Sequence, residues 1–186
     1  MAVQLLRRVF TVEEYHRMVD AGILREDDRV ELLEGEIVEM TPIGSRHAAC
    51  VDRLNSLFVR GLGQRGIVRV QSPVRLGERS EPQPDLALLR ARPDFYAQAH
   101  PGPTDILLLV EVAETSTDVD REVKVPLYAR AGIREVWLVD LAGGYVEIYR
   151  EPAPAGYQQV QRVRPGQRLS PHAVPDLELA MDDVLG

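Results

Sequence analysis

The chain has 186 residues, 45% of them hydrophobic and 27% charged, which is typical of a folded protein and excludes a disordered chain of low hydrophobicity. Its 22 Lys and Arg face 29 Asp and Glu, so the formal net charge of −7 argues against a generally basic nucleic-acid-binding protein. The single cysteine, Cys50, excludes an internal disulfide and the multi-cysteine kinds of zinc site.

The first third of the chain predicts a helix, a β-hairpin and a second helix. Thr11 and Glu14 have the spacing of a capping box, which begins a short helix. Glu34-Gly35 separates two β-like runs, as in a hairpin. Further on, apolar residues recur at helical spacing until glycines interrupt them. The predicted elements are a helix from Thr11 to about Gly22, strands over 29–33 and 36–40, and a helix from Ser45 to about Leu62.

The middle of the chain predicts short strands, a loop and one strand that is buried on both faces. The run from Asp105 to Val112 is apolar on both alternating faces, as a central strand covered on both sides would be. Several prolines between residues 90 and 104 predict a loop before it. The shorter strands are predicted over 67–71, 74–76 and 85–89.

The last third predicts a helix that returns over the sheet, followed by more strands. The helix covers 119–131, with Thr117 or Asp118 as its cap and Gly132 as its stop. Strands are predicted over 135–139 and 145–149, with weak strands near Tyr157 and Leu177. The central strand, this helix and the next strand form one strand–helix–strand unit. We therefore expect an α/β (α+β) fold in which helices flank a mixed sheet.

Nothing in the sequence divides the chain into separate units. It lacks internal repeats, low-complexity tracts and long linkers, so we expect a single domain over 1–186, with a core of about 28–150 and a β-rich tail over 151–186. Its apolar runs are shorter than the ~18 residues that cross a membrane. Its N-terminal residues lack the pattern of a secretory signal. We expect a cytoplasmic protein without membrane contact.

Two carboxylates stand at the ends of apolar strands. Asp85 follows Pro84 and begins an apolar run, while Glu111 projects, by strand alternation, from the face of Leu107 and Leu109. An unpaired buried carboxylate costs several kcal/mol, so a partner or a metal is expected beside Glu111. Two such carboxylates on neighbouring strands form an oxygen-rich site that suits Mg²⁺.

Lys124 is the only lysine of the chain, and all other cationic side chains are arginines. A coding bias towards Arg explains this split, and a lysine that survives the bias indicates a position that requires a compact ammonium. The predicted helix could bring this ammonium back to the strand ends. A purely structural alternative stays open, in which Asp85 caps a turn, Glu111 is a frayed strand end, and Lys124 pairs with Asp120 for ~0.2–0.5 kcal/mol.

The order of these motifs resembles a known nuclease superfamily. Pro84-Asp85, followed by an apolar strand that ends in Glu111, resembles the PD-(D/E)XK superfamily, the fold of many restriction endonucleases. Residues from about 11 to 150 resemble, more specifically, the Uma-two family of restriction-endonuclease-like proteins. The matching segments are Glu31-Leu-Leu-Glu-Gly-Glu-Ile-Val-Glu-Met40, His47, Gln83-Pro-Asp85, Val110-Glu-Val, Asp120-Arg, Lys124, Leu127-Tyr-Ala-Arg-Ala-Gly-Ile and Glu135-Val-Trp-Leu-Val-Asp140.

The resemblance implies both a fold and a reaction. The fold is a restriction-endonuclease-like core with an N-terminal hairpin and helix extension and extra C-terminal strands. The reaction is metal-dependent hydrolysis of DNA phosphodiester bonds. Asp85 and Glu111 would hold Mg²⁺ or Mn²⁺, and Lys124 would be the third catalytic residue, orienting or helping to deprotonate the attacking water.

Further residues are expected to assist this site. His47 and Glu31 are candidates for a place next to the metal ligands. Because the protein is acidic overall, arginines such as Arg46 and Arg53 are expected to contact phosphates. A nuclease that cuts both strands of a duplex usually needs two sites, so we expect a homodimer.

The lysine departs from the commonest superfamily pattern, which places it two residues after the acidic residue, at the position of Ala113. The similar family is thought to supply it from the following helix, where Lys124 is predicted to lie. Two alternatives stay open. One is a catalytically inactive nuclease-fold module that binds DNA or protein, and the other is an enzyme that acts on a different phosphate compound.

Overall fold

The main sheet of the computed structural model has six strands, and residues 7–25, 27–114 and 116–186 are described. In sheet order these are β3 (Gly66–Val70), β4 (Leu86–Arg90), β5 (Ile106–Ala113), β6 (Glu135–Asp140), β7 (Tyr145–Ala153) and β8 (Gly156–Val163). β5 and β6 pair in parallel, whereas the other neighbouring strands pair antiparallel. This mixed sheet, with helices against it, confirms the predicted fold class.

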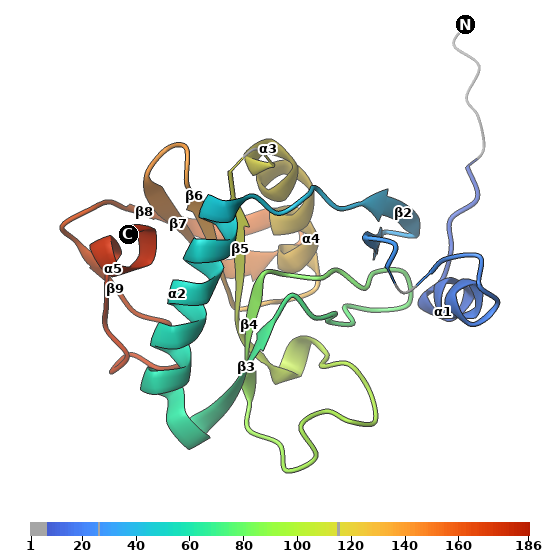
Figure 1. Ribbon diagram of the computed structural model, residues 1–186, viewed down its shortest axis with the longest axis horizontal. Helices are drawn as coiled ribbons and strands as arrows, with labels where there is room; N and C mark the ends of the chain where they lie inside the picture. The colour runs from blue at the N-terminus through green and yellow to red at the C-terminus, as the bar shows by residue number, and fades with distance from the viewer. Residues whose placement is uncertain (1–6, 26, 115) are drawn as a thin grey trace, which may run out of the picture.

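Helices cover both faces of the sheet (Figure 1). One face packs against α2 (Ser45–Leu62) and α5 (Met181–Leu185), and the other against α4 (Val125–Arg130). The short helix α3 (Thr117–Val119) leads into the π-helical turn η3 (Asp120–Lys124), which precedes α4 and forms ion pairs with β5 and β7. The buried residues of β5 alternate between the two cores. Leu108 and Val110 belong to the α2 side, whereas Leu109 and Ala113 belong to the α4 side.

Glu111 lies on the α4 side with Leu109, as strand alternation predicts, but Leu107 does not share that face. Leu107 packs against the α2-side core. The pairing of β4 with β5 shifts register between Leu88 and Leu89, so a β-bulge interrupts the alternation just before Leu108.

The N-terminal segment forms α1 (Val12–Asp20) and a hairpin of β1 (Val30–Leu33) and β2 (Glu36–Glu39), both as predicted. The capping box of Thr11 and Glu14 is present. Glu34 and Gly35 have positive φ angles of 50° and 85°, which a tight two-residue hairpin turn requires. In Figure 1 this segment lies at the opposite end of the molecule from α5. A bridge between Leu32 and Glu81 joins β1 to the loop before β4.

The strand predicted over 74–76 is wrong. Val74 N–H donates to Pro82 O and Leu76 N–H to Ser80 O, so this segment pairs with its own loop rather than with the sheet. The tail is more regular than expected, because β8 pairs with β7 along its whole length. The remaining short elements are η1 (Gly63–Arg65), η2 (Pro103–Asp105), β9 (Arg168–Leu169) and β10 (Leu179–Ala180).

The helix predicted over 119–131 is present from Thr117 to Arg130, but a π-helical turn over Asp120–Lys124 lies within it. Pro126 has no N–H to donate to the preceding turn, and Val125 N–H bonds to Asp120 O, five residues back. Ser116, rather than Thr117 or Asp118, occupies the N-cap position of the helical segment, but its hydroxyl donates to Asp120 Oδ2 and not to the backbone of the first turn. The π turn carries Asp120 and Lys124, both of which are buried.

Within the described ranges, no helix combines the length and apolarity needed to cross a membrane.

Cys50 should report whether α5 is docked on α2. The residue is 0% exposed, and its Sγ lies 3.4 Å from Val184 O of α5. Burial raises the pKa of the Cys50 thiol to about 11, so little reactive thiolate exists at pH 8. We expect a disulfide reagent to label the protein rapidly in denaturing urea and only very slowly under native conditions. Equal labelling rates in the two conditions would contradict this packing.

Candidate active site

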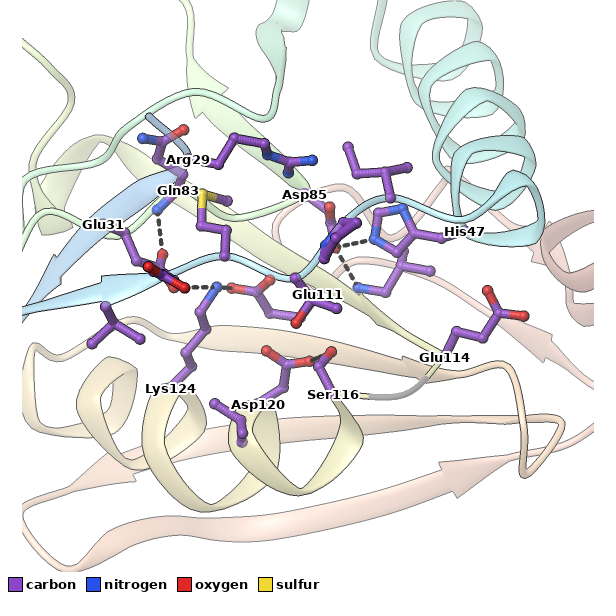
Figure 2. A pocket seen from close by; sticks show the side chains of 18 of the residues that line it. Arg29, Glu31, His47, Gln83, Asp85, Glu111, Glu114, Ser116, Asp120 and Lys124 are labelled. Atoms are coloured by element: carbon purple, nitrogen blue, oxygen red, sulfur yellow. Dashed lines mark hydrogen bonds and ion pairs between the residues drawn. The ribbon is translucent and has the colours of Figure 1, made fainter. Parts of the chain in front are cut away.

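A cavity of about 280 Å³ opens where β4 and β5 meet the hairpin and the π turn (Figure 2). Its lining is rich in carboxylates. The lining carboxylates are Glu31, Glu39, Asp85, Glu111, Glu114 and Asp120, and the lining cations are Arg29 and Lys124. The cavity therefore carries more negative than positive groups.

The structure brings the predicted residues Asp85, Glu111 and Lys124 into this one cavity, together with Glu31 and His47. Asp85 precedes β4, Glu111 lies in β5 and Lys124 ends the π turn. Each comes from a different element, so the site depends on the packing of the helix against the sheet.

Lys124 is held by two buried carboxylates. Its Nζ lies 3.1 Å from Glu31 Oε1 and 3.4 Å from Glu111 Oε1. Lys124 is 6% exposed and Glu111 3%, so Glu111 is not a frayed strand end. Among the described residues, the ion pairs of Lys124 go to these two glutamates and not to Asp120, which accepts a 2.6 Å hydrogen bond from Ser116 Oγ. The expectations of a frayed strand end at Glu111 and of a Lys124–Asp120 pair are therefore wrong.

Asp85 is held mainly through one of its oxygens. Oδ2 accepts a 2.8 Å hydrogen bond from Val112 N–H and lies 3.0 Å from Nε2 of His47. Because a carboxylate oxygen accepts, Nε2 must carry the proton. This hydrogen bond raises the pKa of His47. Among the described residues, the hydrogen bond to Oδ1 is a longer one, 3.3 Å, from Gln71 Nε2.

Burial and crowding perturb the charges of the site. Burial raises the pKa of Glu111 well above its usual range, and the neighbouring carboxylates of Asp120, Asp85 and Glu31 add to this rise. Burial likewise raises the pKa of Asp120. Burial alone would lower the pKa of Lys124, but the carboxylates of Glu111, Glu31 and Asp120 outweigh it and raise that pKa. One ammonium thus faces more negative charge than it neutralises.

A divalent cation fits this environment. Carboxylate oxygens are the ligands that Mg²⁺ prefers, and it commonly takes only one or two of them while keeping several waters. In the described part of the chain, no group of three or more His, Cys, Asp or Glu is arranged to hold a metal by itself. The less engaged oxygens, Oδ1 of Asp85 and Oε2 of Glu111, are the donors that suit such an ion.

Sequence reasoning missed several residues of the cavity. Gln83 N–H donates to Glu31 Oε2 at 3.0 Å and fixes that carboxylate. Tyr128, which lies in the core behind the cavity lining, donates its O–H to Glu111 Oε1. Arg29 is an exposed cation in the lining. The spacing of Asp120, Lys124 and Tyr128, four residues apart each time, was a signal that these side chains share a helix face.

The predicted phosphate contacts, Arg46 and Arg53, are both outside the cavity lining. Arg46 lies near the rim, because its Nη1 is 3.3 Å from Oε1 of Glu114. Arg53 donates to Val184 O and Leu185 O and holds α5 against α2. A phosphate contact by Arg53 would therefore compete with this structural role.

Because the carboxylates around Lys124 outnumber its single positive charge, we expect opposite effects on the free energy of unfolding from two variants of this ion pair. Glu111→Gln removes one crowded negative charge and should raise the free energy of unfolding in EDTA by about 1 kcal/mol. Lys124→Met leaves two buried carboxylates unpaired and should lower it by about 3–5 kcal/mol. Urea denaturation at pH 7.5 measures both. Equal losses in the two variants would contradict the charge excess.

Comparisons with known proteins agree with this architecture. The family model Uma2, described as "Putative restriction endonuclease", matches residues 12–182. A crystal structure described as a putative nuclease belonging to DUF820 from Anabaena variabilis ATCC 29413 is similar, with a TM-score of 0.75 and 17% identity over 95% of this chain and 97% of that chain. At this identity the likeness shows a shared fold. A comparison with curated proteins finds no match. Because the family match covers most of the sequence, the chain belongs to the Uma2 family, as its motifs predict.

Proposed function

We propose that the protein is a metal-dependent endonuclease that hydrolyses DNA phosphodiester bonds, with Asp85, Glu111 and Lys124 as its catalytic residues. One observation carries the proposal. In a family described as putative restriction endonucleases, a buried ammonium lies 3.1 and 3.4 Å from two carboxylates in an acidic cavity that Asp85 also lines. Maintaining such a cluster is costly in a protein without a use for it.

Asp85 and Glu111 would hold Mg²⁺ or Mn²⁺ through Oδ1 and Oε2. When bound, such an ion polarises the scissile phosphate and lowers the pKa of a bound water. His47 and Val112 N–H keep Asp85 oriented through its other oxygen. Glu31 holds Lys124 beside Glu111, where its positive charge can stabilise the negative charge that develops on the phosphate.

The positive charge of Lys124 decides which catalytic roles this residue can have. Its raised pKa keeps the amine protonated at neutral pH, so the ammonium can orient water and phosphate but cannot accept a proton. Asp120 is the better proton acceptor. It lines the cavity, Ser116 engages one of its oxygens, and burial raises its pKa towards the range of an effective general base.

A nuclease-fold module that binds DNA or protein without cleaving it is the second candidate. The net charge of −7 and the displaced lysine favour it, because neither is typical of a DNA-cutting enzyme. The homodimer stays a prediction that belongs to the endonuclease proposal, since cutting both strands of a duplex usually requires two sites.

Cleavage of plasmid DNA tests the proposed function. With Mg²⁺ or Mn²⁺ we expect nicking that EDTA abolishes and that Asp85→Asn, Glu111→Gln and Lys124→Met each slow by about 100-fold or more. Lys124→Arg should fail as well, because a planar guanidinium does not replace a compact ammonium. Asp120→Asn should slow cleavage and flatten its rise with pH.

Glu36→Gln is the matched control, because this exposed carboxylate of β2 lies outside the cavity lining and the charge change is the same. It should cleave like the wild type. Metal binding without cleavage in any form would favour the non-cleaving module, and cleavage that survives Lys124→Met would remove that residue from the mechanism.

Arg29 should contact a substrate phosphate, because it is the one guanidinium among the described lining residues. We expect Arg29→Gln to raise KM with little change in kcat and to reduce the slope of log K against log salt for DNA binding by about 1. Arg79→Gln, an exposed arginine outside this cavity, should change neither. An identical salt slope in the wild type and Arg29→Gln would exclude the contact.

A further inference from the structure

The two oxygens of Glu111 have different surroundings. Oε1 accepts a hydrogen bond from Tyr128 O–H and lies 3.4 Å from Lys124 Nζ. Among the described residues, no hydrogen bond to Oε2 is present, and Glu111 lines the cavity (Figure 2). Two donors thus converge on one oxygen while the other stays available.

Tyr128 is placed by the helix so that it reaches this oxygen. Asp120, Lys124 and Tyr128 follow one another at four-residue intervals through the π turn and α4, on the side that faces β5. The Tyr128 ring is 0% exposed and packs in the α4-side core with Leu109.

We propose that Tyr128 is a positioning residue, which fixes the Glu111 carboxylate so that Oε2 is presented to a divalent cation. This inference rests on the proposed function. Without the phenol, the carboxylate can rotate and offer both oxygens to Lys124, which would close the position that a metal needs. Groups that orient metal-ligating carboxylates typically change metal affinity by about 10–100-fold.

The competing explanation is that Tyr128 bonds to Glu111 only because any buried tyrosine hydroxyl needs a hydrogen-bond acceptor. Tyr149 provides the matched case. It belongs to the same core cluster, is also buried, and donates a 2.7 Å hydrogen bond to Oε2 of Glu147, which is not part of the cavity lining. Loss of either hydroxyl removes one O–H to carboxylate bond, but only Tyr128 contacts Glu111.

Titration with Mn²⁺, followed by electron paramagnetic resonance of the free ion, separates the two explanations without any substrate. We expect Tyr128→Phe to raise the Kd for Mn²⁺ by about 10–100-fold and Tyr149→Phe to leave it unchanged. Tyr128→Met loses the same donor but fills the space with a flexible side chain, and it should match Tyr128→Phe. Protection of Cys50 from labelling establishes the folded concentration of each variant.

Each other outcome overturns the inference. A wild-type Kd in Tyr128→Phe, with Mn²⁺ still bound by the wild type, removes the positioning role but leaves the proposed metal site intact. If Tyr149→Phe loses as much Mn²⁺ affinity as Tyr128→Phe, the loss comes from a general loosening of the core and not from the contact between Tyr128 and Glu111. Absence of Mn²⁺ binding by the wild type defeats the metal-dependent function itself, and the positioning role with it.

Discussion

The buried ammonium of Lys124 is the interaction on which the site depends. It lies within 3.4 Å of carboxylates from β1 and β5, and burial removes the water that would otherwise screen these charges. Charges of this kind remain in a protein interior only when partners compensate them. The hairpin, the central strand and the helix after it must therefore keep their relative positions for the cluster to persist.

The fold supplies those positions in different ways. β5 lies in the interior of the sheet and carries Glu111 into the core, while the parallel pairing with β6 requires the helical crossover that carries Lys124. The π turn aligns Asp120 and Lys124 towards the sheet. Such π-helical turns within α-helices often occur at functional sites. The hairpin is attached through the bridge at Leu32, which brings Glu31 to the ammonium.

The arrangement that orients the carboxylates of the site also lowers the stability of the fold. Each of the two candidate metal carboxylates has one oxygen occupied by two protein donors: Oδ2 of Asp85 by His47 and Val112, and Oε1 of Glu111 by Tyr128 and Lys124. The remaining negative charge is crowded and only partly neutralised. Such strain is the usual cost of a site arranged in advance of its ligand.

The sequence by itself determined most of the helices and strands. It also indicated which charged residues stand in otherwise apolar segments. Capping, alternation and helical spacing predicted α1, the hairpin, α2 and β5, and the single lysine among arginines drew attention to Lys124. These signals are local, because they depend on neighbours within one element. Only the tertiary structure decided that Glu31 pairs with Lys124, that Tyr128 bonds to Glu111 and that Arg53 holds α5, since packing brings these groups together from distant segments. The π turn also needed the structure, because Pro126 alone does not specify whether a helix ends, kinks or widens.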